Sequence, residues 1–235
     1  MFCILTLTAE RPPPNLSSSR RQPPDGQDVP SLRHRRSYEF LPPFMSELRV
    51  VLLRNSWSQR SSEGNFILRE TEFNTEEEPD HCVRVTGQMM EKEIVLINTP
   101  DLLHPDLSED KLTEHVETCK RLSDPGPHVF LLVLQPEDFT EEHKLRLSRV
   151  LQLFSDRSSD HSLVLISTPR EETAGFMERY RQHPPLKEMI RECRYRFLWQ
   201  KDLELDELLT RMVQIEKENN NTRIGETSSI QLSSA

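Results

Sequence analysis

The sequence predicts an α/β domain with a mostly parallel central sheet. Four short apolar runs are near-continuous rather than alternating, and this pattern is typical of strands covered on both faces, as in a parallel sheet. Helical patterns separate the runs, and strands that alternate with helices indicate one domain of this class. The four runs are LRVVLL (48–53), EIVLIN (93–98), VFLLVL (129–134) and SLVLIS (162–167).

Two weaker segments are expected at the edges of the sheet. Residues 82–87 (CVRVTG) alternate apolar and polar side chains, which predicts an edge strand with one solvated face. Residues 195–199 (YRFLW) are the candidate for the last strand.

Two helices are predicted between the strands. Residues 109–122 are charged and expected to be helical. Thr140, which two glutamates follow, predicts a helix start, because a hydroxyl cap and early acidic residues suit the N-terminal dipole. The apolar residues after it recur at helical spacing. They are Leu147, Val150, Leu151 and Phe154.

Two further helices are predicted to close the domain. Pro184 and Pro185 indicate the start of a helix over residues 184–192, because proline is favoured in the first turn. Residues 205–218 place five apolar side chains on one stripe, and we expect Asn219–Asn221 to end this amphipathic helix.

Both ends of the chain are expected to be disordered. Residues 1–46 hold eight of the seventeen prolines, with Ser and Arg between them. Such a segment cannot bury enough apolar surface to offset the entropy of ordering it. The Ser- and Thr-containing tail over residues 219–235 is also expected to be disordered. The domain is therefore expected to span residues 47–218.

The charge balance argues against a nucleic-acid-binding protein. The formal net charge is −9. Residues 1–46 contribute +2, from six arginines and four acidic residues, which leaves −11 for the rest. A nucleic-acid-binding domain would show a basic face instead. No apolar stretch reaches the ~20 residues of a membrane helix, so membrane contact is expected to be peripheral at most.

The cysteines indicate a reducing compartment. No CxxC motif or Cys/His metal spacing is present, which predicts free thiols in a cytoplasmic protein. Cys119 and Cys193 fall on predicted helices, where we expect them to be packing residues. The four cysteines are Cys3, Cys82, Cys119 and Cys193.

The segment LRVVLLRNSWSQRSSEGNFIL (48–68) predicts a strand, a polar loop and the start of a helix. A nucleotide-binding domain keeps its phosphate loop at such a place. That loop needs glycines, because its backbone adopts unusual φ angles close to the phosphates. No glycine occurs between Leu48 and Glu63.

Three segments together carry a family resemblance. They are the segment just quoted, EIVLINTPDLL (93–103) and DPGPHVFLLVLQPEDFTEEHK (124–144). In this order they resemble the AIG-type G domain of the GTPases of immunity-associated proteins, the IMAP family. The resemblance covers about residues 47–217 and implies a three-layer, P-loop NTPase-like fold of the Ras and septin type. It also implies GTP and Mg²⁺ as ligands, and homo- or hetero-oligomers with related G domains.

The phosphate-loop pattern of the family, G-x-x-x-x-G-K-[ST], is largely lost. Arg54 and Gln59 stand at the two glycine positions and Arg60 at the lysine position. Ser61 is kept and is the one candidate ligand of Mg²⁺. The planar guanidinium of Arg60 does not replace a compact ammonium inside a closed loop.

The γ-phosphate motif, usually Asp-Thr-Pro-Gly, is here Asn98-Thr99-Pro100-Asp101. Asn98 removes the carboxylate that supports Mg²⁺, and Asp101 places a carboxylate where the phosphate would lie. At about 4 Å such a like-charge pair costs ~1 kcal/mol in water and ~4 kcal/mol at an effective dielectric of 20. This change opposes triphosphate binding.

The remaining motifs are also altered. The switch threonine falls near Pro79, and Thr71 or Thr75 could replace it only in a loop of different length. In the motif that selects guanine, Arg170 occupies the acidic position in a gapless frame, whereas Glu171 occupies it in a frame shifted by one. Pro169 stands at the lysine position.

Two functions remain open on the sequence, and a third explanation stays beside them. The first is a pseudo-GTPase that acts as an interaction or assembly module, with hydrolysis not expected. The second is an atypical guanine-nucleotide switch that retains weak GTP binding. The third is that the chain is a defective copy or an incomplete gene product. No catalytic residue is assigned, and His128 is expected to form structural hydrogen bonds.

Overall fold

The computed structural model describes residues 47–55, 80–89, 92–171 and 175–232. These residues belong to the structural unit Ser37–Ala235. The loop that would carry Gln59, Arg60 and Ser61 lies outside the described residues, as do Cys3 and the expected disordered segment 1–46.

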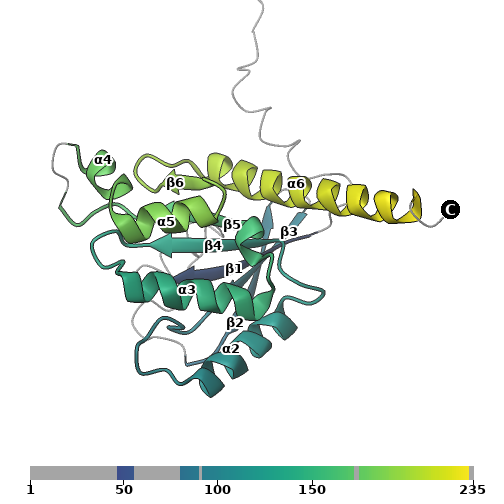
Figure 1. Cartoon of the computed structure of the whole chain (residues 1–235), viewed down its shortest axis with the longest axis horizontal. Helices are drawn as coiled ribbons and strands as arrows, with labels where there is room; N and C mark the ends of the chain where they lie inside the picture. Colours follow the sequence, from purple (N-terminus) through teal and green to yellow (C-terminus); the bar gives the residue numbers. More distant parts are fainter. Residues whose placement is uncertain (1–46, 56–79, 90–91, 172–174, 233–235) are drawn as a thin grey trace, which may run out of the picture. The chain divides into compact units, whose positions relative to one another are not determined.

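A six-stranded sheet forms the centre of the domain, in the order β2-β3-β1-β4-β5-β6 (Figure 1). Every neighbouring pair is parallel except β2 and β3, which form an antiparallel hairpin at one edge. This arrangement confirms the predicted fold class. The strands are β1 (Glu47–Arg54), β2 (Val83–Met89), β3 (Lys92–Asn98), β4 (Val129–Leu134), β5 (Ser162–Ile166) and β6 (Phe197–Trp199).

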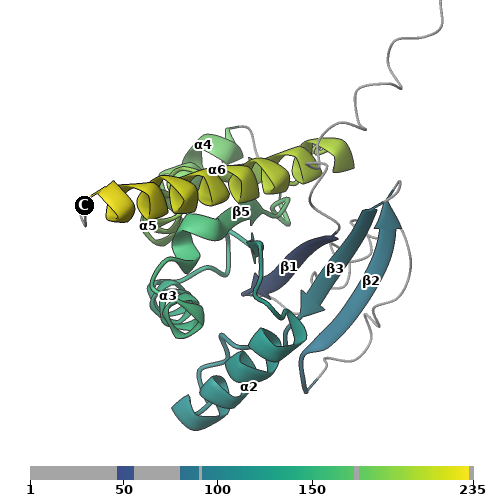
Figure 2. The ribbon, with the colours of Figure 1, turned by 90° about the vertical axis from the view of Figure 1, so that its right-hand side faces the viewer.

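Helices cover both faces of the sheet, which makes three layers (Figure 2). Helices α2 (Glu109–Leu122), α3 (Glu141–Phe154) and α5 (Pro184–Glu192) pack on one face. The other face is covered by α6 (Leu205–Leu232). Two short elements, η1 (Ser158–His161) and α4 (Phe176–Arg181), complete the order.

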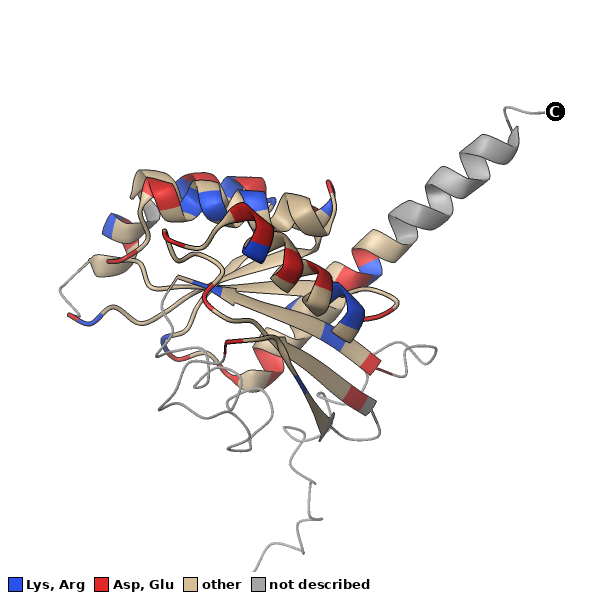
Figure 3. Ribbon diagram, turned by 90° about the horizontal axis from the view of Figure 1, so that it is seen from below, with Lys and Arg blue, Asp and Glu red and all other residues tan. Residues whose placement is uncertain are grey.

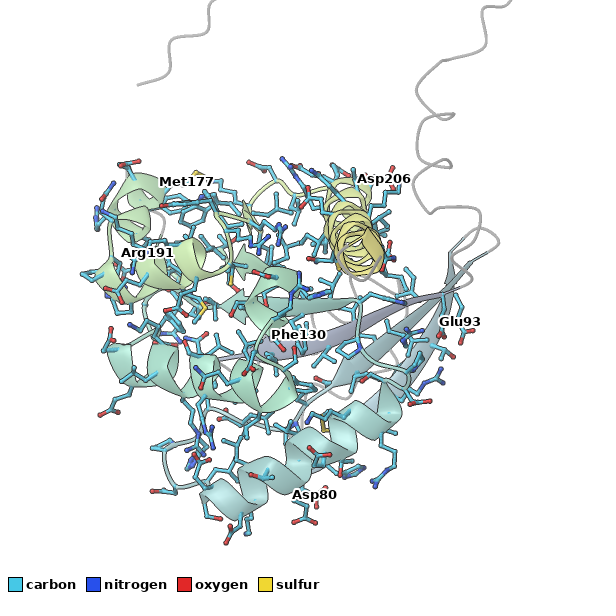
Figure 4. All side chains as sticks on the ribbon, turned by 45° about the vertical axis from the view of Figure 1, so that its right-hand side comes forward. Asp80, Glu93, Phe130, Met177, Arg191 and Asp206 are labelled. Atoms are coloured by element: carbon cyan, nitrogen blue, oxygen red, sulfur yellow. A yellow bond between two sulfur atoms is a disulfide. The ribbon has the colours of Figure 1, made fainter. Side chains whose placement is uncertain are left out.

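The apolar runs form the core because successive side chains of a strand point to opposite faces. In β1, Val51 and Leu53 enter the cluster under α2, α3 and α5, whereas Val50 and Leu52 enter the cluster under α6. Phe130 of β4 lies in the first cluster, in the interior of the domain (Figure 4). Charged residues lie mainly on the helices and at the strand ends (Figure 3).

The predicted helix starts are confirmed by their caps. The hydroxyl of Thr140 accepts a hydrogen bond from the backbone N–H of His143 at 3.3 Å, and the His143 ring accepts one from the Thr140 N–H. Ser108 caps α2 by accepting from the N–H of Lys111. Each cap satisfies a donor that the first helical turn leaves without a partner.

The closing helix does not end at Asn219–Asn221, as expected, but continues to Leu232. The amide of Asn219 explains why this residue does not act as a stop signal. It donates to the carbonyl of Ile215 one turn earlier and to the carbonyl of Asp160 in η1, and the residue is buried. The domain boundary at residue 218 stays a prediction.

The expectation of free thiols is wrong for two cysteines. Cys82, just before β2, forms a disulfide with Cys119 of α2, and their Cα atoms are 5.8 Å apart. The two residues are 37 positions apart and meet only because α2 folds back along the sheet, so no local spacing signals the pair. Cys193 is free and fully buried, and burial raises the pKa of its thiol to about 12.

His128 has the structural role expected of it. Its ring Nδ1 accepts a hydrogen bond from the backbone N–H of Arg49 at 2.9 Å. The backbone N–H of His128 donates to the Arg49 carbonyl at 2.9 Å. The Arg49 Nε donates to the carbonyl of Gly126, at the turn that precedes β4. Gly126 has φ 136°, which is a conformation that side chains with a Cβ rarely adopt. These contacts hold the turn against β1.

Replacing Leu132 with Ala should lower the free energy of unfolding by about 2–5 kcal/mol, because the leucine is fully buried in β4 and its loss leaves a cavity. Urea unfolding measures the change. Leu145→Ala is the matched control, since Leu145 on α3 is 59% exposed. Equal effects of the two substitutions would contradict the assignment of Leu132 to the core.

Replacing Glu188 with Gln should destabilise the protein at pH 7 but not near pH 3. Lys144 of α3 pairs with Glu188 of α5 and with Glu141, and its hydrogen bond lowers the pKa of Glu188. A lowered pKa gives stability that is present above the unfolded pKa and is lost as pH falls through the folded one.

The effect should be small, because the Glu188 side chain is 42% exposed and solvent screens the ion pair. Thermal melts at the two pH values measure it. Glu114→Gln, on the exposed side of α2, is the control and should show no such dependence on pH.

Candidate functional site

The candidate site lies where the parallel strands end. The registers place Asn98 of β3 beside Leu52 of β1, and Arg54 of β1 beside Val133 of β4. Leu134 of β4 in turn pairs with β5. The carboxyl ends of four strands therefore meet at one end of the sheet, which we call the carboxyl edge. This is the usual place for ligands in open α/β sheets.

At the end of β1, Arg54 occupies the first glycine position of the phosphate-loop pattern. It is 2% exposed and is among the largest buried side chains. A glycine at this position would leave the space open. The next residue, Asn55, binds the end of β4 through its side chain. Its Oδ1 accepts from the backbone N–H of Gln135 at 2.8 Å, and its Nδ2 donates to the Gln135 carbonyl at 3.1 Å.

At the end of β3, the four residues of the altered γ-phosphate motif form a turn of their own. Asn98 is buried, and its Oδ1 accepts no hydrogen bond from the described residues. The Thr99 hydroxyl donates to the carbonyl of Leu52 at 2.9 Å. Asp101 accepts from the backbone N–H of Leu103 at 3.1 Å. The Asp101 carboxylate is thus engaged within its own loop.

Beyond β5, Arg170 bridges to the loop after β4. Its backbone N–H donates to Glu137 at 2.7 Å, and its guanidinium forms a bidentate ion pair with Asp138, with one N–O distance of 3.0 Å. The hydrogen bond to Asp138 raises the pKa of Arg170. The base loop is therefore tied to a neighbouring loop by groups of this chain. Glu171 is exposed beside it.

Gln135 connects these loops. It is fully buried, and its side-chain amide donates to Glu137 and, at 3.5 Å, to the carbonyl of Thr168. The N–H of Thr168 donates to the side chain of Gln200 at 3.2 Å, beyond β6. Hydrogen bonds thus run from the end of β1 through β4 to the loops after β5 and β6.

The structure brings four of the predicted positions to this edge, namely Arg54, Asn98, Asp101 and Glu171. Gln59, Arg60 and Ser61 lie outside the described residues. Sequence reasoning missed the roles of Asn55, Gln135 and Asp138. The polar residues that directly follow the apolar strands were the available signal, but their pairing depends on strand order.

Neither a metal centre nor a membrane-spanning helix occurs within the described residues. No group of three or more His, Cys, Asp or Glu side chains in the described ranges is placed to hold a metal ion. Within the same ranges, no helix has the length and apolar character to cross a membrane.

Comparison with solved structures shows the same fold in GTPases. Toc33 from Arabidopsis thaliana, in a dimerization-deficient mutant, superposes with a TM-score of 0.59 and 16% identity, over 74% of this chain and 86% of that one. Toc33 in complex with Mg²⁺ and GMPPNP gives 0.58. Era from Aquifex aeolicus, bound to GDP and AlF4⁻, gives 0.52 with 16% identity, over 73% of this chain and 57% of that one. These likenesses concern the fold alone.

Sequence comparison shows the family. GTPase IMAP family member 8 from Homo sapiens is 26% identical over 178 residues, which cover 73% of this chain but 27% of that protein. Immune-associated nucleotide-binding protein 5 from Arabidopsis thaliana is 27% identical over 120 residues, which cover 50% of this chain and 39% of that protein. The sequence model of the AIG1 family matches residues 48–232. The chain therefore belongs to the AIG1 family, and its fold is that of a P-loop GTPase.

Proposed function

We propose that this chain is a pseudo-GTPase that acts as an interaction or assembly module. The observation that carries the proposal is that polar groups at the carboxyl edge of the sheet bind one another. Asn55 is paired with Gln135, and Arg170 with Asp138. Asp101 is engaged in its own turn. Polar side chains at the edge where a nucleotide would bind are thus engaged within the protein.

The described residues do not fit a Mg²⁺–GTP complex. Asn98 offers a neutral amide where the metal needs support from a carboxylate. Asp101 adds a negative charge to the motif that would contact the γ-phosphate, and like charges repel. Arg170 can only donate hydrogen bonds, whereas recognition of guanine at this position needs an acceptor. We therefore derive no hydrolytic step.

The proposal also includes the residues of the altered phosphate loop. Gln59 and Arg60 would replace the phosphate cradle with side chains, and Ser61 alone would not hold Mg²⁺. The alternative is a guanine-nucleotide switch with weak GTP binding. It would use Arg54 and Arg60 for the phosphates and Glu171 for the base.

The assembly role has support from a structural neighbour. In the chloroplast translocon components atToc33 and psToc159, dimerization is important for the GTPase activity. We propose that this chain also associates with related G domains, in homo- or hetero-oligomers, through the edge around the former nucleotide site. The cytoplasmic location and peripheral membrane contact expected from the sequence belong to this proposal.

A titration of the full chain with a fluorescent GTP analogue and Mg²⁺ should show no saturable binding up to about 1 mM. The physical reason is the loss of the carboxylate at Asn98 together with the added charge of Asp101. GDP and ATP serve as competitors, and circular dichroism establishes that the protein is folded.

Asp101→Gly is the informative variant, because it removes the repulsive carboxylate without restoring the other groups. It too should bind no nucleotide. Micromolar binding with a preference for guanine in the unmodified chain would overturn the pseudo-GTPase proposal in favour of the switch. Glu171→Ala would then test the base contact.

Self-association should be the same with and without GTP, as measured by sedimentation velocity, because assembly does not depend on a nucleotide. Glu171→Arg, at the proposed interface, should weaken association roughly tenfold, which corresponds to about 1.4 kcal/mol. Glu117→Arg on α2 is the matched control. Glu117 lines a hollow with the Pro125–Pro127 turn, which precedes β4 and so lies away from the carboxyl ends of the strands. A chain that assembles only with GTP, or that never associates, would contradict the assembly role.

A further inference from the structure

We propose that Cys82 and Cys119 form a reversible redox staple that fixes helix α2 to the start of strand β2. The inference does not depend on the proposed function. It starts from the disulfide between these residues, which closes a separation of 37 positions.

The staple lies inside the domain. Cys82 is 4% exposed and Cys119 is fully buried, and both belong to the cluster between the sheet and its helices. Leu112, Val116 and Cys119 form the buried stripe of α2. Cys119 is therefore one of the three buried residues through which the inner side of α2 meets the core.

The same site accommodates the reduced state. The Sγ of Cys82 lies 3.4 Å from the carbonyl oxygen of His115, one turn before Cys119 on α2. On reduction the two sulfurs must separate, and a Cys82 thiol that keeps its position has this carbonyl as an acceptor. A thiol at Cys119 would remain among apolar neighbours, which suits a buried cysteine.

The fold does not need the bond. Small secreted domains need disulfides because their cores are small. Here the sheet is buried on both faces by two apolar clusters. Both redox states therefore keep the fold, and the bond changes how firmly one helix is attached.

The disulfide affects how firmly the C-terminal half of α2 is attached to the sheet. Its first turn is held toward α3 by the ion pair of Glu109 with Arg149, at 3.1 Å. Arg146 of α3 donates to the carbonyls of Leu102 and Leu107, just before α2. Cys119 is in the last two turns, so the disulfide ties this half to the β2–β3 hairpin. Reduction should loosen this half first.

The exchange is balanced with a glutathione disulfide as oxidant. Because both sulfurs are buried, the exchange takes place when the C-terminal half of α2 opens locally. One cysteine thiolate then attacks a sulfur of the glutathione disulfide, and one glutathione leaves as a thiolate. The second cysteine then displaces the other glutathione from the mixed disulfide. The protein loses two electrons and two protons, and one glutathione disulfide becomes two glutathione thiols.

The first test equilibrates the full chain in buffers of varied ratio of reduced to oxidised glutathione. Alkylation of thiols followed by peptide mass spectrometry reports each cysteine separately, including Cys3. Cys82 and Cys119 should be alkylated together after unfolding from reducing buffer, and protected together from oxidising buffer. A pair that stays bonded in excess reduced glutathione, or that never bonds in excess oxidised glutathione, overturns the reversible staple.

The second test measures what the bond does. Oxidation should raise the melting temperature by roughly 5–15 °C and slow hydrogen exchange of α2 amides. Cys82→Ser and Cys119→Ala should both lose this response. Cys193→Ser is the matched control and should keep it, because Cys193 is also buried but is free. The proposal fails if the unmodified chain shows no redox response, or if either paired-cysteine variant keeps it.

Discussion

The burial of β1 on both faces is the constraint on which the rest of the structure depends. This strand pairs in parallel with β3 on one side and β4 on the other. Its alternate side chains supply both apolar clusters. Parallel partners require long connections, and the described connections place helices on the two faces. Layer order, strand order and the edge where the carboxyl ends meet all follow from this arrangement.

At that edge, the polar groups of this chain bind one another rather than standing free. The strands contribute almost no polar groups to it, because their interior positions are apolar. Most of the polar groups there belong to residues that follow a strand, such as Asn55, Gln135 and Arg170. Their bonds link the loops after β1, β4, β5 and β6 to one another. The hydrogen bonds that join the loops therefore lie outside the apolar strand interiors that form the scaffold.

The sequence was sufficient to predict what depends on periodicity and local chemistry. The apolar runs predicted buried parallel strands, and the Thr140 cap and Pro184 predicted helix starts, because these signals act within a few residues. Pairings between residues distant in the sequence could not be predicted. The Cys82–Cys119 disulfide and the Arg170–Asp138 ion pair depend on which strands are neighbours, and single-sequence patterns do not encode that order. The prediction of where α6 ends was wrong for a related reason, because Asn219 donates a hydrogen bond to η1, which is distant in sequence.

The reciprocal bonds between Asn55 and Gln135 have a consequence for the behaviour of the protein in a changing environment. A connection completed by a bound molecule strengthens and weakens with the concentration of that molecule, because binding to the folded state shifts the unfolding equilibrium. A connection between two groups of one chain has no such dependence. The link from β1 to β4 therefore contributes a constant amount to stability, whatever the supply of small molecules around the protein.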